Sequence, residues 1–414
     1  MIKKILLNNK NLIFFDQGMV SGSNFISTLL IARMLGLNDF GIFSTLWLVL
    51  LIINSIYMSL IVLPMMTLVP KQKKLSEYFS HLFFIQILFI AFVMFFSFFV
   101  AFFYMDFLKL NINIVTILLF VLMVALYHMQ DFYRRYFFAI KKYIKVLIID
   151  FLSYISRVII LIVVFALKIK LSLNLILIIF NFTFFFGVLI GVFNYKIIYN
   201  IKNLKVTVLE HWKISKWLLP SGFMQWTSIN LFIVLASLIL GPIAVGAIKI
   251  GQNIAMAFNV ILQGMENFIP LNASKVYIAK KKEGLIKYLQ KVSVIGLFVV
   301  ILFGTIISLF SKDLILILYG KKYIDYYYII IWYSLILIFM YIILIIRVYL
   351  RTINNTKIWY KAYIITSGYA LMISYPLLKF CALNGVMFGI LTAHLVLIIS
   401  VYFLLKRERK YVLS

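Results

Sequence analysis

Apolar runs long enough to cross a lipid bilayer recur along the whole chain and are separated by short polar stretches. A hydrocarbon core of about 30 Å requires roughly 20 apolar residues in a helix. Twelve runs reach this length, and they lie at residues 11–34, 41–69, 82–105, 112–132, 146–167, 172–195, 216–240, 243–270, 290–311, 326–346, 358–379 and 384–405. The pattern therefore predicts an all-α polytopic membrane protein with about 12 transmembrane helices.

Composition agrees with this prediction and explains the high positive charge. The chain is 65% hydrophobic and 13% charged, and its mean hydropathy is +1.09, outside the range of soluble domains. A net charge of +28 would suggest nucleic acid binding in a soluble protein, but these cations lie in short loops between apolar runs. Alternating the spans puts 30 lysines and arginines on the side of the N-terminus and 8 on the other. This asymmetry predicts cytoplasmic termini and excludes nucleic acid as a partner.

A short internal repeat predicts how the spans are grouped. The segment LGLNDFGIF at 35–43 resembles LGPIAVGAI at 240–248, at an offset of 205 residues. Each segment joins the first and second spans of a set of six. We therefore predict two six-helix bundles, residues 1–205 and 206–414, arranged as parallel repeats with a central cavity between them.

A lysine inside the eighth span is the first candidate for a functional residue. At 3.6 residues per turn, several polar side chains fall on the same helical face as this lysine, while the opposite face is apolar. The polar face carries Lys249, Gln252, Asn253, Met256, Gln263 and Asn267. A buried cation costs about 2.5–3.5 kcal/mol on insertion scales, so a wet cavity beside Lys249 is one interpretation. The alternative is a side chain that reaches the outer headgroups.

The fifth span contains two further charges, Asp150 and Arg157, two turns apart on one predicted face. Arg157 falls near the middle of the membrane. Its planar guanidinium is suited to bidentate contact with phosphate. The alternative is that Arg157 pairs with an acid or a carbonyl on a neighbouring helix. Asp150 is a candidate site for a coupling proton or sodium ion.

The first span carries a polar stripe that we expect to face the same cavity. Its members, spaced by three or four residues, are Gln17, Ser21, Asn24 and Thr28. Asp16 lies beside the stripe and is a second candidate for proton or sodium coupling, although an aspartate near a helix N-terminus can also complement the helix dipole. Arg33 lies at the outer end of the span, where an interfacial arginine is common.

Proline and glycine mark two places where helices bend or pack closely. Pro220 and Gly222 open the seventh span and predict a kink or hinge, followed by Ser221, Gln225 and Ser228 on one face. A kink that only improves packing is the alternative. Gly187 and Gly191 form a GxxxG pattern, which predicts close helix packing in the sixth span.

The sequence contains no grouping typical of a catalytic or metal centre. The histidines, His81, His128, His211 and His394, are scattered, and the single cysteine cannot form an internal disulfide. We therefore expect a protein that is not an enzyme and that needs no cofactor or bound metal.

Two segments resemble a known family. SGSNFISTLLIARMLGLNDFGIFSTLW at 21–47 is similar to the opening of bacterial polysaccharide flippases, the O-antigen (Wzx-type) transporters of the multidrug/oligosaccharidyl-lipid/polysaccharide (MOP) exporter superfamily, and LGPIAVGAIKIGQNIA at 240–255 is similar to that family's second-half repeat. The resemblance implies two six-helix bundles around a cationic lumen in the bacterial inner membrane. By residue type, Lys249, Arg157 and Arg33 match its cationic positions.

The resemblance also implies a role in polysaccharide and lipopolysaccharide biosynthesis. Such a flippase moves undecaprenyl-pyrophosphate-linked oligosaccharide from the inner to the outer leaflet. Its partners would be the lipid-linked oligosaccharide, membrane lipids, and the polysaccharide polymerase and chain-length machinery. One alternative is a multidrug antiporter for organic cations, which would need acids in its cavity. Another is a membrane polysaccharide polymerase or ligase, for which we expect a large external loop.

Overall fold

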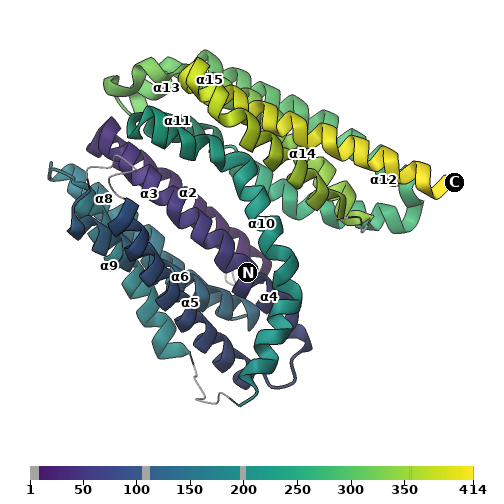
Figure 1. Ribbon diagram of the computed structural model, residues 1–414, viewed down its shortest axis with the longest axis horizontal. Coiled ribbons are helices and arrows are strands. Elements are labelled where there is room, and N and C mark those ends of the chain that lie inside the picture. The colour runs from purple at the N-terminus through teal and green to yellow at the C-terminus, as the bar shows by residue number, and fades with distance from the viewer. Residues whose placement is uncertain (1–8, 105–111, 196–201, 354, 356, 414) are drawn as a thin grey trace, which may run out of the picture. The chain divides into compact units, whose positions relative to one another are not determined.

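The computed structural model describes residues 9–104, 112–195, 202–353, 355 and 357–413, and this part of the chain is helical and without strands (Figure 1). The chain divides into two compact units, residues 1–223 and 224–414. This division falls within one long helix, three residues after Pro220. The bundle boundary at 205/206 inferred from the repeat remains a prediction.

The first unit is built from the helices before the boundary. They are α2 (Asn9–Leu35), α3 (Leu37–Tyr57) with its continuation through η1 (Met58–Val62), α4 (Leu63–Leu68) and η2 (Val69–Lys71), α5 (Leu75–Tyr104), α6 (Ile114–Ala139), α7 (Tyr143–Asp150), η3 (Phe151–Ile155), α8 (Ser156–Ala166), α9 (Leu173–Asn194) and the first part of α10 (Leu204–Leu240).

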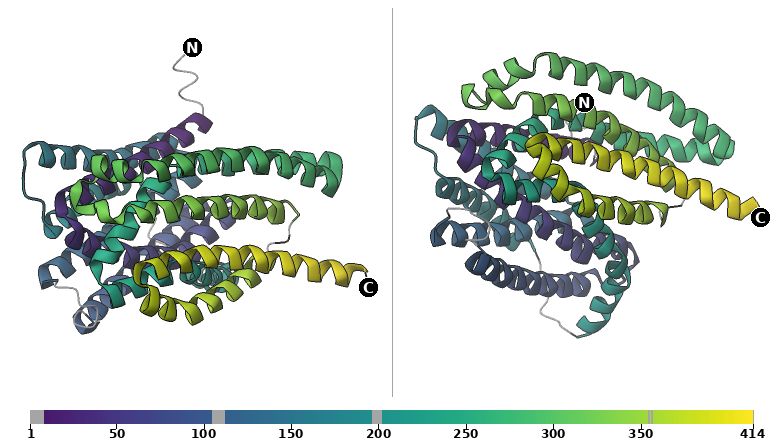
Figure 2. Two further views of the ribbon diagram at one scale, coloured as in Figure 1. Left: turned by 90° about the horizontal axis from the view of Figure 1, so that it is seen from above. Right: turned by 45° about the horizontal axis from the view of Figure 1, so that its top comes forward.

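The second unit contains the rest of α10 and the helices after it. They are α11 (Pro242–Met256), α12 (Asn259–Leu309), α13 (Ser311–Leu318), η4 (Lys321–Tyr326), α14 (Tyr328–Thr352) and α15 (Lys357–Leu413). The backbone leaves the helical conformation inside α12 at Lys281 and inside α15 at Ala382. The two halves of α15 fold back on one another, as Figure 2 shows, and the Tyr369 hydroxyl donates to Thr392 Oγ1 at 2.8 Å. The eleventh and twelfth predicted spans are thus two antiparallel helices.

Nine helical stretches among the described residues are long and apolar enough to cross a membrane. They are Leu37–Lys71, Leu75–Phe99, Ile114–Ala139, Tyr143–Ala166, Leu173–Asn194, Leu204–Leu240, Asn272–Leu309, Tyr328–Thr352 and Lys357–Arg407. The last of these holds two of the twelve predicted spans, and helices also occupy the predicted first and eighth spans. The protein is therefore a multi-pass, all-α membrane protein.

The internal repeat corresponds to a shared backbone turn. Gly36 precedes α3 with φ 84° and ψ 169°, and Gly241 precedes α11 with φ 84° and ψ 178°. Side chains with a Cβ rarely adopt such a positive φ, so glycine is favoured at both positions. The two glycines are 205 residues apart, which is the offset of the sequence repeat.

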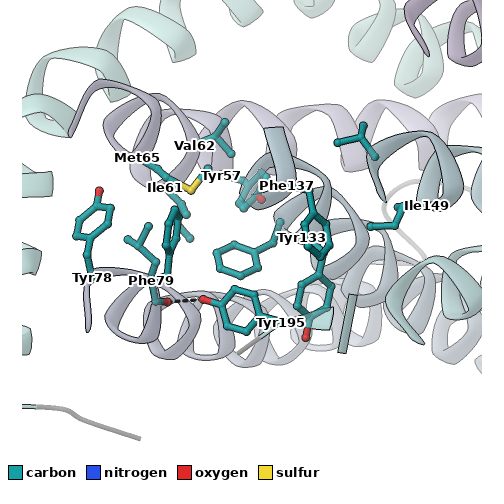
Figure 3. Packing of buried hydrophobic residues seen from close by; sticks show 13 residues of the cluster. Tyr57, Ile61, Val62, Met65, Tyr78, Phe79, Tyr133, Phe137, Ile149 and Tyr195 are labelled. Carbon is teal, nitrogen blue, oxygen red and sulfur yellow. Dashed lines mark hydrogen bonds between the residues drawn. The ribbon is translucent and has the colours of Figure 1, made fainter. Parts of the chain in front are cut away.

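An aromatic cluster forms the core of the first unit (Figure 3). Tyr195, at the end of α9, lies 4.5 Å from Tyr136 and 5.6 Å from Tyr133 between ring centroids, and its hydroxyl donates to the Phe79 carbonyl. Aromatic pairs in such tilted arrangements stabilise a core beyond their area burial. These contacts hold α9 against α5 and α6.

The predicted GxxxG packing is confirmed at the contact between α6 and α9. A Cβ at Gly187 would overlap Ser153 and Gln130, and one at Gly191 would overlap the Tyr133 ring. The absence of a side chain therefore allows α9 to approach α6 and η3 closely.

We predict that Gly191→Ala lowers the free energy of unfolding by about 1–3 kcal/mol, because the buried Tyr133 ring must shift to admit the new methyl group. Gly18→Ala is the control, since a Cβ at Gly18 has no neighbour within 4 Å and alanine favours the helix. Thermal unfolding of the purified variants measures both effects. Equal shifts in the two variants would contradict this account of α9 packing.

Candidate functional site

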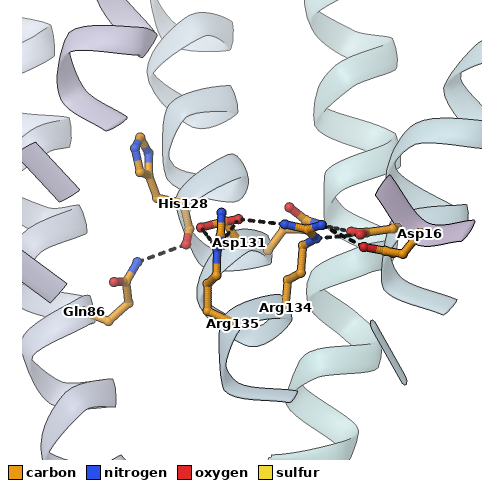
Figure 4. Close-up of polar contacts among 8 residues, drawn as sticks. Asp16, Gln86, His128, Asp131, Arg134 and Arg135 are labelled. Carbon is orange, nitrogen blue, oxygen red and sulfur yellow. Dashed lines mark hydrogen bonds and ion pairs between the residues drawn. The ribbon is translucent and has the colours of Figure 1, made fainter. Parts of the chain in front are cut away.

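A buried network of acids and arginines joins three helices of the first unit (Figure 4). Arg134 on α6 donates from Nη2 to Asp16 Oδ2 on α2 at 2.9 Å and from Nε to Asp150 Oδ2 on α7 at 2.5 Å. Gln130, one turn before Arg134, donates to the second oxygen of Asp150 at 3.1 Å. Asp16 and Asp150 are 1% and 0% exposed. One guanidinium thus links both candidate coupling residues.

The network holds more acids than bases. Asp131 completes it, with its carboxylate 3.3 Å from Arg135 Nε and 3.8 Å from Arg134 Nη1. Three carboxylates therefore face two guanidiniums. Asp16 Oδ1 is buried and has no hydrogen-bond partner among the described residues. This oxygen is a position where a proton or a small cation would balance the charge.

The sequence alone predicted the positions of these residues incompletely. Asp16 lies seven residues after Asn9, the first described residue of α2, so it is not in the first turn and the helix-dipole alternative does not apply. Arg134 and Arg135 were assigned to a loop after residue 132, but α6 continues to Ala139. Burial against Asp16 and Asp150 lets Arg134 stay in the helix. The i, i+3 and i, i+4 spacing of Asp131, Arg134 and Arg135 was the signal in the sequence.

Arg157 on α8 forms a separate site in the same unit. Its Nη2 donates to Asn24 Oδ1 at 2.8 Å, its Nε donates to Ser27 Oγ at 3.3 Å, and its guanidinium lies 4.2 Å from the Phe180 ring centroid. The side chain is 1% exposed, yet Nη1 has no hydrogen-bond partner, and none of the ion pairs among the described residues includes Arg157. Arg157 thus contacts a side-chain carbonyl oxygen and a hydroxyl on α2. A carbonyl on a neighbouring helix was one of the two interpretations of Arg157, and contact with phosphate stays a prediction.

A π-helical segment separates the two sites. Asp150 and Arg157 were expected on one face, but η3 inserts wider turns between them. Asp150 consequently bonds Gln130 and Arg134 on α6, whereas Arg157 bonds Asn24 and Ser27 on α2. Such π segments occur frequently at functional sites.

The residues of the polar stripe in the first span make different contacts. Asn24 accepts a hydrogen bond from Arg157, and Ser27, outside the predicted stripe, is the second partner of Arg157. Thr28 donates to the Asn24 carbonyl of its own helix at 2.8 Å, and Gln17 is half-buried. Arg33 is exposed and lies 5.8 Å from the Phe165 ring centroid.

In the second unit, Lys249 is half-buried on α11 and donates to Gln252 Oε1 at 3.2 Å. The ion pairs found among the described residues do not include Lys249. The helix tightens into a turn after Met256 before α12 begins. The polar face predicted for residues 249–267 is thus interrupted, and the side chains of Gln263 and Asn267 lie outside the described part of the chain.

Asn253 on α11 is fixed from the other side by the segment between α13 and η4. Its amide donates to the Tyr319 hydroxyl at 2.8 Å. Burial raises the pKa of Tyr319, so the hydroxyl stays neutral and can accept this bond. Lys249, Gln252 and Asn253 therefore share one surface of α11. Asn253 is bonded to Tyr319, and Lys249 is bonded to Gln252 within the part of the chain that the structure describes.

In the seventh span, helix α10 runs from Leu204 to Leu240 with Pro220 in its interior. The kink or hinge at Pro220 and Gly222 stays a prediction. Gly222 allows α10 to approach α3, since a Cβ there would lie 3.0 Å from Ser59 Oγ and 3.2 Å from Ser55 Oγ. This contact supports the packing interpretation of the Pro220 and Gly222 pair.

Comparison with solved structures places this helical arrangement in a known fold. A structure described as the inward-facing conformation of a multidrug resistance MATE family transporter of the MOP superfamily aligns with a TM-score of 0.77, at 11% identity over 94% of this chain and 93% of that chain. The protein has the MATE fold. Residues 220–377 also match the sequence profile of the MatE family.

Other proteins of the MATE fold align over most of their length. The lipid II flippase MurJ, in an inward closed conformation, gives a TM-score of 0.72 at 14% identity, covering 95% of this chain and 87% of MurJ. The Vibrio cholerae MATE transporter VcmN gives a TM-score of 0.64 at 12% identity, covering 98% and 97%. No curated protein sequence matched the chain. These structures are named as transporters and flippases. The expectation that the protein is not an enzyme stays a prediction.

Proposed function

We propose that the protein is a transporter that moves an anionic, lipid-linked oligosaccharide across the bacterial inner membrane. The single observation that carries this proposal is Arg157, a buried guanidinium with an open Nη1 and without a carboxylate among its contacts in the described part of the chain. A buried cation of this kind attracts a phosphate or pyrophosphate, which it can contact through two N–H groups. The flippase MurJ, which shares the fold and is named for lipid II, supports a lipid-linked substrate.

The substrate we favour is undecaprenyl-pyrophosphate-linked oligosaccharide, an O-antigen or a related surface polysaccharide unit, moved from the inner to the outer leaflet. In the first unit, Arg157 would bind the pyrophosphate, with the Asn24 side chain beside it for a sugar hydroxyl. In the second unit, Lys249, Gln252 and Asn253 offer a cation and two amides for the same kinds of substrate group. An inside-negative potential assists outward movement of an anion by about 2.3 kcal/mol per charge per 100 mV. Both termini of the protein would lie in the cytoplasm. After export, the polysaccharide polymerase and chain-length machinery would act on the oligosaccharide unit.

The second candidate is a multidrug antiporter for organic cations, which the MatE match and the MATE structures favour. Such a substrate requires a carboxylate that is free to bind it. In the first unit, however, Asp16, Asp131 and Asp150 are all paired with Arg134 or Arg135. We therefore favour the anionic substrate. The MATE fold of transporters gives no support to the polymerase or ligase alternative.

The acidic network provides a candidate site for ion coupling. Protonation of Asp16, or a sodium ion at its open Oδ1, would balance three carboxylates against two guanidiniums. Either event would weaken the contact between Asp16 and Arg134, and with it the link from α2 to α6 and α7. We propose that Asp16 and Asp150 couple transport to H⁺ or Na⁺ in this way.

Reconstitution in vesicles tests the proposed function directly. Fluorescent undecaprenyl-pyrophosphate-linked oligosaccharide is placed in one leaflet, and its exposure in the other leaflet is followed with a membrane-impermeant quencher. We expect transfer that depends on the protein. Efflux of an organic cation such as ethidium, without transfer of the lipid-linked sugar, would instead establish the multidrug antiporter.

In the same assay we predict that Lys249→Glu reduces transfer at least about tenfold, because an attractive charge becomes repulsive to the pyrophosphate and tenfold corresponds to only 1.4 kcal/mol. Lys287→Glu makes the same charge change at an exposed position of α12 and should transfer normally. Normal transfer by both Lys249→Ala and Lys249→Glu would show that Lys249 does not bind the substrate.

A further inference from the structure

Aromatic side chains from four elements of the first unit gather beside Arg157. The guanidinium carbon lies 4.2 Å from the Phe180 ring centroid, 5.2 Å from that of Tyr154 and 5.9 Å from that of Phe184. All three rings are buried. They hold the guanidinium within the unit but leave its Nη1 without an acceptor.

Two further rings form the edge of this aromatic cluster. Trp47 on α3 lies 5.8 Å from Phe180 between ring centroids, and Tyr127 on α6 lies 5.5 Å from Phe184 and 6.4 Å from Trp47. Unlike the rings in contact with Arg157, both are half-buried. A single ring, Phe180 or Phe184, therefore separates each of them from the guanidinium.

Trp47 and Tyr127 each carry a polar group that the described part of the chain leaves unused. The indole N–H of Trp47 and the hydroxyl of Tyr127 have no hydrogen-bond partner among the described residues, and neither atom is fully buried. The rings that contact Trp47 are inclined to it by 33° for Phe43 and by 69° for Phe180. No ring in this contact set lies flat against the indole, so a ligand can reach its face.

The positions of Trp47 and Tyr127 on their helices distinguish them from residues that face lipid. The exposed Val49 lies about 200° around α3 from Trp47, and half-buried Asn54, seven residues after Trp47, shares the Trp47 side. The exposed Leu118 lies about 180° around α6 from Tyr127. Apolar residues suited to lipid contact are thus on the opposite side of each helix.

An aromatic face with unused N–H and O–H groups at its edge has the chemistry that recognises a sugar ring. One side of a pyranose consists largely of C–H bonds and packs on an aromatic face, while the hydroxyls around its rim exchange hydrogen bonds with polar groups. The location agrees with this, because a sugar joined to a pyrophosphate at Arg157 begins about one ring width from the guanidinium. Trp47 and Tyr127 lie at that separation.

We propose that Trp47 and Tyr127 bind the first sugar of a pyrophosphate-linked saccharide whose pyrophosphate contacts Arg157. The Trp47 indole stacks on the C–H face of the pyranose, and the Trp47 N–H and the Tyr127 hydroxyl donate to sugar oxygens. This inference rests on the proposed function, since it takes Arg157 as the pyrophosphate site. It adds a means of selecting a lipid carrier that bears a sugar over one that has released it.

Binding of two soluble probes to the full-length protein in phosphatidylcholine nanodiscs tests the inference. The probes are citronellyl pyrophosphate and citronellyl-pyrophosphate-linked N-acetylglucosamine, which share the lipid and the pyrophosphate and differ in the sugar. Isothermal titration calorimetry gives the dissociation constant of each. We expect the wild type to bind the sugar-bearing probe about tenfold more tightly, which is the upper range for one aromatic contact.

Variants of the two rings locate the sugar contact. Trp47→Leu should bind both probes equally, with the affinity that the wild type has for citronellyl pyrophosphate. Tyr127→Phe keeps its ring and should retain part of the preference for the sugar. Trp217→Leu removes an indole from an exposed position of α10 and should behave like the wild type. If Trp47→Leu does not fold, Trp47→Phe replaces it and should reduce the preference to about threefold, because a smaller ring remains.

The sugar contact and the proposed function fail in different ways. If the wild type binds both probes equally, or if Trp47→Leu keeps the preference, the sugar contact is wrong and the pyrophosphate site at Arg157 still stands. Loss of the preference in Trp217→Leu would also overturn the inference, because the effect would not be local. If the wild type binds neither probe, the anionic substrate of the proposed function is wrong together with the sugar contact.

Discussion

Arg134→Met is expected to lower the free energy of unfolding by about 3–5 kcal/mol, the cost of removing one partner from a buried ion pair. Arg134 is 6% exposed, and it is the residue that contacts both Asp16 and Asp150. Its removal leaves two carboxylates buried without their counter-charge and disconnects α2 from α6 and α7. We expect a large drop in the midpoint of thermal unfolding and poor recovery from the membrane.

Two further variants separate the electrostatic cause from a general packing defect. Arg135→Met removes a guanidinium from the same network, but that side chain is 28% exposed and its ion pair among the described residues is with Asp131, so its effect should stay below about 1 kcal/mol. Adding Asp150→Asn to Arg134→Met removes one of the stranded charges and should restore part of the lost stability. If the double variant is as unstable as Arg134→Met, the loss arises from packing and the charge argument fails.

Arg157→Gln is expected to reduce transfer of the lipid-linked oligosaccharide about 10- to 100-fold, which corresponds to losing a charged hydrogen bond of about 1.5–3 kcal/mol. The glutamine amide can still bond Asn24 and Ser27, so the contact with α2 is largely kept. Only the positive charge and the open Nη1 are lost. Leaflet exposure in reconstituted vesicles gives the rate, and thermal unfolding shows whether the fold is intact.

The companion variants distinguish binding of the substrate from a structural role. Arg157→Lys keeps the charge but cannot make the bidentate contact, so its transfer rate should lie between the wild type and Arg157→Gln. Arg351→Gln removes a charge at an exposed position and should transfer at the wild-type rate. Wild-type transfer by a folded Arg157→Gln variant would eliminate Arg157 as the headgroup site and remove the main support for an anionic substrate.

Local features of the sequence were sufficient to predict the helical segments. Hydrophobic runs predicted helices throughout the described chain, because the backbone must satisfy its own hydrogen bonds within lipid. The spacing of Gly187 and Gly191 predicted close packing, since this needs only the lack of a side chain. The repeat marked the segments that contain Gly36 and Gly241, and the structure showed the turn that these glycines share. The predicted positions of the helix ends were less accurate, as α6 shows, because buried partners allow charged residues to stay within a helix.

The candidate site followed from residue type only in part. Asp16, Asp150 and Arg157 were singled out because charges are costly in a membrane, and all three are buried. Their partners could not be read from spacing. Arg134 was assigned to a loop, Ser27 was outside the expected stripe, and η3 altered the face that Asp150 and Arg157 were expected to share.

The sequence by itself determined that this protein is a multi-spanning helical membrane protein with a short internal repeat and a few charges that are costly to bury. Only the tertiary structure decided that Arg134 neutralises Asp16 and Asp150 while Arg157 bonds an amide and a hydroxyl. The reason is physical: periodicity along one helix fixes which side chains share a face, but the state of a buried charge depends on which other helix packs against that face.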